Sequence, residues 1–576
     1  MKPTSFVRPS FLALTALLLA ACTVSLRDTT GTFAFNDPNN LQTFRAETDS
    51  TRVLDVEVEV QNGPTAPLAQ SVNEWSATVQ FPRCASPVFY TYRVRYRAGL
   101  LTRTKTFPEA GVFSRGITNR PDDCANVPVT GGRTFVVDST ADLPDASPGD
   151  GQCVAASDGG EVCTLRAAVM EANASPGTDR IELSKARHVL SRTLPSGSEA
   201  EGSPNDAFGD LDITDSVVIT APRSGGDDLG SVLRTEVSAG QTTLKNLDAD
   251  DESLDRTDAD ALFARVDGGG IDRVFQVHAI RGGEGFAVFE NFAIVNGAVF
   301  DRGGAGIRND GALRLDHVVV AENRAHPAGG PGGVFSANRG AGIVNYGFLQ
   351  ASDLAVVRNK VTEETGFAGG LFNQNGATAL IERSLFAFNE ARFASAIYND
   401  QNEDLPPPGA DLTLVNATIT GNRVTGSVRG ALINQGTASL HFVTVVENAS
   451  ITGVVSSSGA ITRLGNTALA DNGQRDCAGG FVSLGFNTVS DATGCALMLG
   501  TAPNPQDLLN APALFGVLGD NGGFLYTLRP LANASSAANV VDRGQGLFAQ
   551  PPTDARGPGF LRSVGGSPDV GAVEVN

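Results

Sequence analysis

Apolar and polar residues alternate in short stretches that keep a fixed distance from a recurring asparagine. Counted back from each asparagine, the residues three, eight and ten positions earlier are apolar, with Thr462 the one exception. The asparagines are spaced by 27, 36, 30, 33, 26 and 24 residues, so the loops vary while the internal register stays constant. Period two indicates strands, and constant register with variable loops is typical of a solenoid. The asparagines are Asn296, Asn323, Asn359, Asn389, Asn422, Asn448 and Asn472.

Each unit begins with a corner rich in glycine and asparagine, as at residues 306–311, 342–347 and 431–436. Both residue types tolerate the left-handed backbone of tight corners, and no helical periodicity interrupts the region. The pattern predicts an all-β protein whose main domain is a right-handed parallel β-helix, the pectate-lyase-like solenoid, with rungs about 4.8 Å apart. We expect the asparagines to form an internal ladder along one corner. A row of amides that binds a ligand is the alternative.

Residues 22–130 have a different pattern and predict a small β-sandwich-like domain. Residues 53–60, 75–81 and 89–96 alternate cleanly between apolar and polar positions. Three or more strands with one apolar face are enough for a separate module. We expect a spacer, and a binding domain is the alternative.

Residues 163–173 predict an amphipathic helix, with Leu165, Ala168, Val169 and Ala172 on its apolar face. Such a helix can cover the open end of a solenoid and protect its first strand. The segment Cys163-Thr164-Leu165-Arg166-Ala167-Ala168 resembles the CSLREA domain, named for a Cys-Ser-Leu-Arg-Glu-Ala motif that precedes β-helix repeats in secreted bacterial proteins. Thr164 and Ala167 depart from that motif, and the loss of its Glu weakens any chemical role. The resemblance implies an N-terminal capping segment at residues 131–195, before repeats at 196–505.

The C-terminal residues 506–576 lack the repeat. With the Cys477–Cys495 stretch, residues 520–523, 554–557 and 568–574 are similar to the choice-of-anchor Q domain. The resemblance implies surface attachment, and since no sorting tail is visible the anchor is expected elsewhere. The two resemblances and the repeats together cover residues 131–576, and they imply architecture rather than activity.

The N-terminus predicts export and lipid attachment. Lys2 and Arg8 precede an apolar run at residues 11–19 that is too short to span a bilayer as a mature helix. The run ends in Leu19-Ala20-Ala21-Cys22, which looks like a bacterial lipobox. We expect residues 1–21 to be a lipoprotein signal peptide and Cys22 to carry the lipid, at the outer membrane or cell surface. The residue after Cys22 is Thr23 rather than the Asp that would direct retention in the inner membrane. An ordinary secretory signal is the alternative.

The remaining cysteines are even in number, which favours disulfides in an exported chain. Their positions form three local couples, so we expect Cys84–Cys124, Cys153–Cys163 and Cys477–Cys495. A metal site at cysteines is not expected, because no close Cys-x-x-Cys pair is present.

The composition limits the possible partners. The formal net charge is −20, which disfavours nucleic acid and anionic membrane surfaces as partners. No cofactor is predicted. Calcium binding at the acidic residues 247–260 is a weaker hypothesis, since the segment lacks the Gly and terminal Glu of an EF-hand loop. The oligomeric state is left open.

No catalytic constellation stands out. Asp316 and Asp353 lie near one predicted corner and could meet on neighbouring rungs, while His317 and His441 approach the same corner. We therefore expect no enzyme but a lipid-anchored envelope protein that acts in adhesion, surface structure or glycan binding. The alternative is a polysaccharide lyase or glycoside hydrolase, because β-helices host such enzymes.

Overall fold

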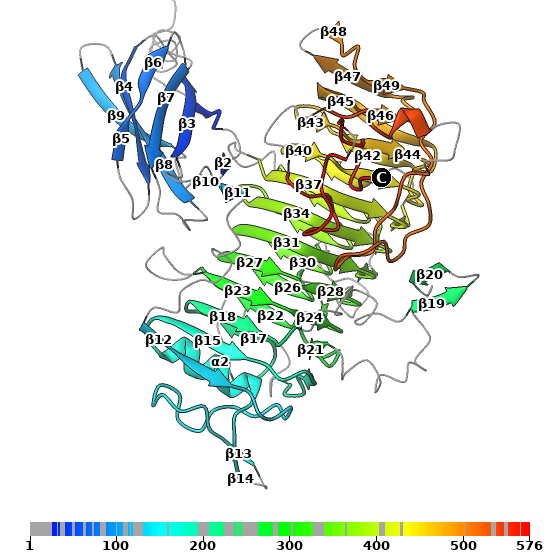
Figure 1. The fold of residues 1–576 in the computed structure, drawn as a ribbon. Coiled ribbons are helices and arrows are strands. Elements are labelled where there is room, and N and C mark those ends of the chain that lie inside the picture. The colour runs from blue at the N-terminus through cyan, green and yellow to red at the C-terminus, as the bar shows by residue number, and fades with distance from the viewer. Residues whose placement is uncertain are drawn as a thin grey trace, which may run out of the picture. The chain divides into compact units, whose positions relative to one another are not determined.

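The computed structural model describes residues 26–30, 33–34, 41–48, 52–60, 65–71, 74–80, 88–98, 101–107, 113–115, 117–118, 131–157, 160–193, 207–223, 235–238, 241–244, 263–279, 286–300, 303–326, 339–362, 366–401, 409–426, 430–499, 502–531, 537–545, 551–564 and 566–575. The chain divides into two compact units, residues 1–126 and 127–576. The first unit contains antiparallel sheets and the second a long parallel β-helix (Figure 1). The predicted fold class is confirmed in these respects.

The first unit has two main antiparallel sheets around one core. Its core combines Phe44 and Trp75 of the first sheet with Val58, Tyr90 and Tyr92 of the second. The first sheet is formed by β1 (Leu26–Asp28), β3 (Leu41–Thr48), β7 (Glu74–Gln80) and β6 (Ala69–Ser71). The second is formed by β10 (Phe113–Arg115), β8 (Val88–Ala98), β9 (Leu101–Phe107), β4 (Val53–Val60) and β5 (Thr65–Pro67). A short parallel pair joins β2 (Phe33–Ala34) to β11 (Ile117–Thr118).

The second unit is built from coils whose strands stack into three faces. The first face contains β12 (Gly131–Val136), β15 (Thr178–Glu182), β18 (Val217–Thr220), β23 (Ala287–Glu290), β27 (Ala312–Asp316), β31 (Phe348–Val357), β34 (Thr378–Ala387), β37 (Asp411–Thr420), β40 (Thr437–His441) and β43 (Ile461–Gly465). Because β31, β34 and β37 are long, their second halves continue around a corner into the second face.

The second face also contains β16 (Arg187–Val189), β21 (Ala264–Asp267), β24 (Phe292–Val295), β28 (Val319–Ala321), β41 (Thr444–Val446), β44 (Ala468–Ala470), β46 (Thr488–Val489) and β49 (Leu508–Leu509). The third face contains β17 (Leu211–Ile213), β22 (Phe275–Val277), β26 (Ile307–Asn309), β30 (Ile343–Asn345), β33 (Leu371–Asn373), β36 (Ile397–Asn399), β39 (Gly430–Asn434), β42 (Thr452–Ser456), β45 (Arg475–Gly485) and β47 (Cys495–Leu499).

A fourth, separate sheet follows the second face in five successive coils. It contains β25 (Ala298–Phe300), β29 (Arg324–His326), β32 (Lys360–Val361), β35 (Glu390–Ala391) and β38 (Arg423–Val424). Smaller elements are the hairpins β13 (Ala155–Ser157) with β14 (Gly160–Val162) and β19 (Thr235–Ser238) with β20 (Gln241–Leu244), the short strand β48 (Ala502–Pro503) paired with β47, and the helix η2 (Ala537–Asn539).

The solenoid begins earlier than the predicted repeat boundary at residue 196. Strand β15 pairs with β18, and β16 pairs with β21, so residues 178–189 already belong to the stack. The predicted helix is present as α2 (Leu165–Ala174), and its N-cap Thr164 accepts a hydrogen bond from the Ala167 N–H at 3.1 Å. The apolar face of α2 packs into the main hydrophobic core, so the helix covers the N-terminal end of the solenoid, as predicted.

Two asparagine ladders run through the solenoid. Along the predicted ladder each side-chain Nδ2 donates to the next Oδ1, from Asn323 through Asn359, Asn389 and Asn422 to Asn448 and Asn472, at 2.8–3.1 Å. Each Nδ2 also donates to a backbone carbonyl of the preceding coil, for example from Asn389 to Val356 at 2.8 Å. These amides are therefore used internally, as polar groups buried at a corner must be.

The prediction for Asn296 was wrong by one residue. Strand pairing aligns Val295 with Ala321, so Gly297 and not Asn296 occupies the ladder position beside Asn323. Asn296 instead takes the left-handed position before the ladder, at φ 55°, as Glu322 does at φ 59°. Asparagine suits both positions, which explains the error.

The second ladder was not predicted, although its residues lie in the glycine- and asparagine-rich corners. Nδ2 of Asn309 donates to Asn345, Asn345 to Asn373, Asn373 to Asn399 and Asn399 to Asn434, at 2.7–2.8 Å. The signal was an asparagine at the end of five successive third-face strands, β26, β30, β33, β36 and β39.

The C-terminal segment packs on the outside of the second face. The outward side of this face carries Ala293, Val319, Ala355 and other small apolar residues, and Phe524 and Leu525 of the C-terminal segment, among others, pack against it. The segment is also held by side chains of the coils. Asn466 exchanges two hydrogen bonds with the Gln545 backbone, at 2.8 and 2.9 Å.

Candidate functional site

A column of left-handed residues marks the corner between the first and second faces. His317, Asp353 and Arg383 occupy successive coils of this column, with φ values of 52°, 52° and 45°. The left-handed turn after each first-face strand directs the chain toward the second face, which leaves these side chains in one row. The strand residues just before them, Asp316 and Glu382, add two carboxylates. We call these five residues the corner cluster.

The members of the corner cluster contact one another across three coils. His317 Nδ1 lies 2.8 Å from Asp316 Oδ1, and its Nε2 lies 3.6 Å from Asp353 Oδ2. Arg383 donates through Nη2 to Asp353 at 2.9 Å and through Nη1 to Glu382 at 3.0 Å. The structure therefore brings Asp316 and Asp353 together at one corner, where His317 lies between them.

Charge and burial separate the pKa values of the carboxyl groups along this edge. Burial acts to raise the pKa of Asp316, but the hydrogen bond and charge of His317, with the charge of Arg314, bring it below its ordinary value. Burial raises the pKa of Glu382, against the charge of Arg383. Burial and the negative charge of Asp316 likewise raise the pKa of Glu290, one coil before Asp316. Carboxyl groups with pKa values shifted in opposite directions are typical of acid–base pairs.

The corner cluster is a poor metal site. Asp316, His317 and Asp353 place possible ligand atoms within 4.8 Å of one another. However, Arg383 Nε lies 3.1 Å from Oδ1 and 3.2 Å from Oδ2 of Asp353, so both oxygens of this carboxylate already face a guanidinium. A cation there would have to displace Arg383. The arrangement is an ion-pair network rather than a ligand set.

The C-terminal segment borders this cluster. The ring of Phe524 lies edge-on to His317, with the centroids 5.2 Å apart. A Cβ on Gly557 would lie 3.6 Å from the Arg383 side chain. Side-chain exposure is 21% for His317 and 18% for Arg383, so the network is only partly open to solvent.

The other histidines do not join the corner cluster. His441 lies four coils from Asp316 in the same strand-end column, where burial and then the charge of Arg463 lower its pKa to about 4. His278 Nε2 lies 2.5 Å from Asp212 Oδ1 near the start of the third face. His326 stacks on Phe300 in the fourth sheet.

A second acidic group lies in the C-terminal segment. Asp542, Asp569 and Glu574 bring carboxylate oxygens within 4.8 Å of one another. Asp569 and Glu574 are buried and accept backbone N–H bonds, such as the one from Val575 to Asp569 at 2.7 Å. Burial raises the pKa of Glu574 to about 7. These carboxylates organise the chain end.

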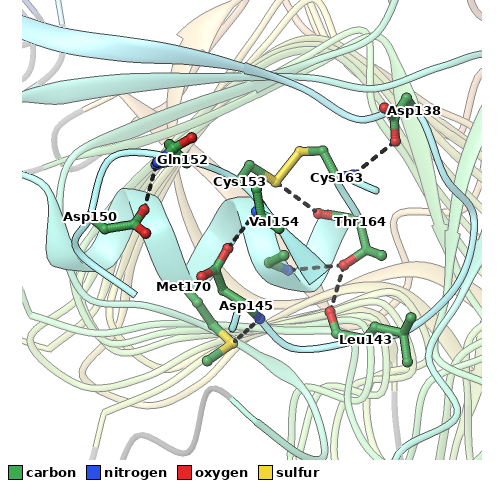
Figure 2. The surroundings of a disulfide bond; sticks show 11 residues. Asp138, Leu143, Asp145, Asp150, Gln152, Cys153, Val154, Cys163, Thr164 and Met170 are labelled. Atoms are coloured by element: carbon green, nitrogen blue, oxygen red, sulfur yellow. Dashed lines mark hydrogen bonds between the residues drawn. A yellow bond between two sulfur atoms is a disulfide. The ribbon is translucent and has the colours of Figure 1, made fainter. Parts of the chain in front are cut away.

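Two disulfide bonds are present among the described residues. Cys153 is bonded to Cys163 beside the start of α2, and Cys477 is bonded to Cys495 near the end of the third face. Figure 2 shows the first, with Thr164 Oγ1 donating to the Leu143 carbonyl at 2.6 Å. Such bonds indicate an extracytoplasmic protein.

Other predicted positions lie outside the described residues. These are Cys22, the expected Cys84–Cys124 pair and the acidic residues 247–260. Among the described residues, no helix is long and apolar enough to cross a membrane.

Comparisons of the chain with protein-family models, with curated proteins and with solved structures gave no match. The geometry of the chain's own residues therefore carries the functional argument.

Proposed function

We propose that this protein is an exported envelope protein, anchored by lipid at Cys22, whose solenoid binds an extracellular glycan and has no catalytic role. The N-terminal unit would act as a spacer above the anchor. The resemblances to the CSLREA and choice-of-anchor Q domains agree with surface attachment. The disulfides support the exported location.

The observation that favours binding over catalysis is that the charged side chains of the corner cluster are already paired with one another. Its cation Arg383 is shared by Asp353 and Glu382, and His317 is shared by Asp316 and Asp353. Charges that already neutralise one another have little capacity left to stabilise a transition state. A long, regular β-surface still offers an extended polymer a repeating set of side chains, one per coil.

A hydrolase remains the second candidate because of one observation. Glu290 and Asp316 are paired on neighbouring strands, and their pKa values are shifted in opposite directions. Neighbouring strands lie about 4.8 Å apart, which is near the separation of about 5 Å found between the two carboxyls of retaining glycosidases. In such a role Glu290 would donate the proton and Asp316 would attack the sugar.

A screen of the mature chain from residue 23 against acidic and neutral glycans tests both candidates. Retention of a glycan without new reducing ends supports the binding role. New reducing ends that disappear in Glu290→Gln and Asp316→Asn would replace it with the hydrolase. No retention and no cleavage would refute both.

A further inference from the structure

The end of the chain follows the column of left-handed residues between the first and second faces. We call its described residues, 551–564 and 566–575, the strap. The column residues on five successive coils have φ values between 45° and 54° and contact the strap. They are Asp353, Arg383, Asn416, Phe442 and Asn466. The strap therefore covers both the corner cluster and the coils beyond it.

Arg562 anchors the middle of the strap on this column. Its guanidinium carbon lies 4.5 Å from the centre of the Phe442 ring, and its Nη2 donates to Asn416 Oδ1. Asn416 in turn donates through Nδ2 to the Thr553 carbonyl at 2.9 Å. A buried guanidinium and a buried amide are thus partnered across the boundary between solenoid and strap, which makes docking dependent on fixed geometry.

Two glycines bring the strap backbone close to the column. The Gly571 N–H donates to the Asn466 carbonyl at 2.8 Å. A Cβ on Gly557 would lie 3.6 Å from the Arg383 side chain and 3.8 Å from Asp353 Oδ1, which is ordinary van der Waals contact. The Gly557 backbone therefore lies directly beside the ion pair of the corner cluster and limits its exposure to solvent.

Buried carboxyl groups hold the last residues of the strap. Glu574 accepts the Val564 N–H at 3.0 Å through Oε1 and the Asp569 N–H at 2.8 Å through Oε2. Asp569 and Glu574 are both buried, and together with Asp542 they bring carboxylate oxygens within 4.8 Å of one another. Ionisation of Glu574 would thus place a negative charge in a dry site beside other acidic groups.

The charged surroundings of Glu574 set its protonation. The Glu574 N–H donates to Asp554 Oδ2 at 2.9 Å, and Arg556 Nη2 donates to the Glu574 carbonyl at 2.7 Å. Burial raises the pKa of Glu574 to about 7; the charge of Asp569 adds to this rise and that of Arg562 opposes it. Burial lowers the pKa of Arg562 to about 10, so this anchor stays charged when Glu574 ionises. Among the described residues, the charged groups around Glu574 are Asp542, Asp554, Asp569, Arg556 and Arg562.

We propose that the strap is a pH-operated cover of the corner cluster, docked in mildly acidic medium and released in mildly alkaline medium, when Glu574 loses its proton beside Asp569 and Asp542. A buried carboxyl group of this kind stabilises the docked state while it is protonated and loses that contribution as the pH rises. Release would take Gly557 away from Arg383 and open the ion-pair network to solvent. The proposal goes beyond the glycan-binding role, and its test uses no glycan.

Limited proteolysis of the mature chain with subtilisin at about pH 6 and about pH 8.5 tests the proposal, because cleavage follows the population of the open form. Mass spectrometry measures cleavage within the strap. Each rate is divided by that of a synthetic peptide of residues 551–575 at the same pH, which removes the pH dependence of the protease. The test variant is Glu574→Gln. The control variant, Glu447→Gln, removes a carboxyl group whose pKa burial also raises, at a left-handed position of the solenoid.

A pKa of 4.5 in the released strap and of about 7 in the docked strap lowers the ratio of docked to released protein about tenfold between these two pH values. Normalised cleavage should therefore rise about tenfold in the wild type and in Glu447→Gln, and less than about twofold in Glu574→Gln. At about pH 8.5, phenylglyoxal should modify Arg383 faster in the wild type than in Glu574→Gln.

Cleavage of the wild-type strap that does not rise with pH would overturn the proposal without reference to any variant. An equal rise in the wild type and Glu574→Gln would also overturn it, since the change would then not depend on this carboxyl group. Equal modification of Arg383 in the two proteins would show that the strap does not cover the corner cluster. None of these results would bear on glycan binding.

Discussion

Removal of one ladder amide should destabilise the solenoid far more than removal of the asparagine just outside the ladder. In the wild type, Asn389 Nδ2 donates to the Val356 carbonyl at 2.8 Å and to Asn422 Oδ1 at 3.0 Å. Its Oδ1 accepts from the backbone N–H and the Nδ2 of Asn359, at 3.0 and 3.1 Å. Asn389→Ala would delete all four interactions inside a fully buried corner.

The magnitude follows from the groups left without a partner. Asn359 Nδ2 keeps the Val320 carbonyl at 2.9 Å, and Asn422 Oδ1 keeps the Asn389 N–H at 2.9 Å. The Asn359 N–H and the Val356 carbonyl lose the contacts that Asn389 provided. Two buried polar groups at roughly 1–3 kcal/mol each give a loss of about 2–6 kcal/mol in the free energy of unfolding.

Asn296→Gly is the matched control. Asn296 stands outside the ladder, and its Nδ2 donates to Asp267 at 2.9 Å. Glycine accepts its left-handed backbone without strain, so we expect a loss below about 1 kcal/mol. Strand pairing, rather than the spacing in the sequence, distinguishes Asn389 inside the ladder from Asn296 outside it.

Unfolding in guanidinium can be followed separately for the two units. Trp75, the only tryptophan, lies in the core of the first unit, so its fluorescence reports that unit, while far-ultraviolet circular dichroism includes the solenoid. Asn389→Ala should shift the circular-dichroism transition and leave the fluorescence transition in place. Equal shifts for Asn389→Ala and Asn296→Gly, or a loss below about 1 kcal/mol for Asn389→Ala, would refute the ladder argument.

Three further predictions concern the C-terminal segment and the capping helix α2. Arg562→Met should release the C-terminal segment to proteolysis, because buried Arg562 donates to the Gly571 and Ala572 carbonyls at 3.0 and 2.6 Å; unchanged cleavage would contradict this. Burial raises the pKa of Glu574 from 4.5 to about 7, so the stability that its protonated form contributes is present below about pH 4.5 and is lost as the pH rises to about 7. Glu574→Gln should therefore flatten this part of a profile of unfolding free energy against pH. An unaltered slope would count against this prediction. Replacing Cys153 and Cys163 by serine should cost about 2–4 kcal/mol and speed amide exchange in α2, whereas unchanged exchange would show that the disulfide does not hold the cap.

The corner cluster shows how far spacing can reach toward a site. Asp316 and Asp353 were expected near one corner, because each lies at a similar distance before a ladder asparagine. Their contact through His317 depends on the left-handed turn that aligns residues of successive coils. Arg383 was not expected there, since nothing in the sequence distinguishes an arginine that reaches the preceding coil from one that faces solvent. Only the stacked geometry shows that the carboxylates are already paired.

The sequence by itself determined the solenoid, its asparagine corner and the capping helix, because these depend on local periodicity and on residues that favour tight turns. Tertiary structure decided the exact register at Asn296, since asparagine fits both the ladder and the left-handed position before it. It also decided that the C-terminal segment returns over the second face. That packing depends on contacts between residues far apart in the chain, which a repeat of 24–36 residues with variable loops does not encode locally.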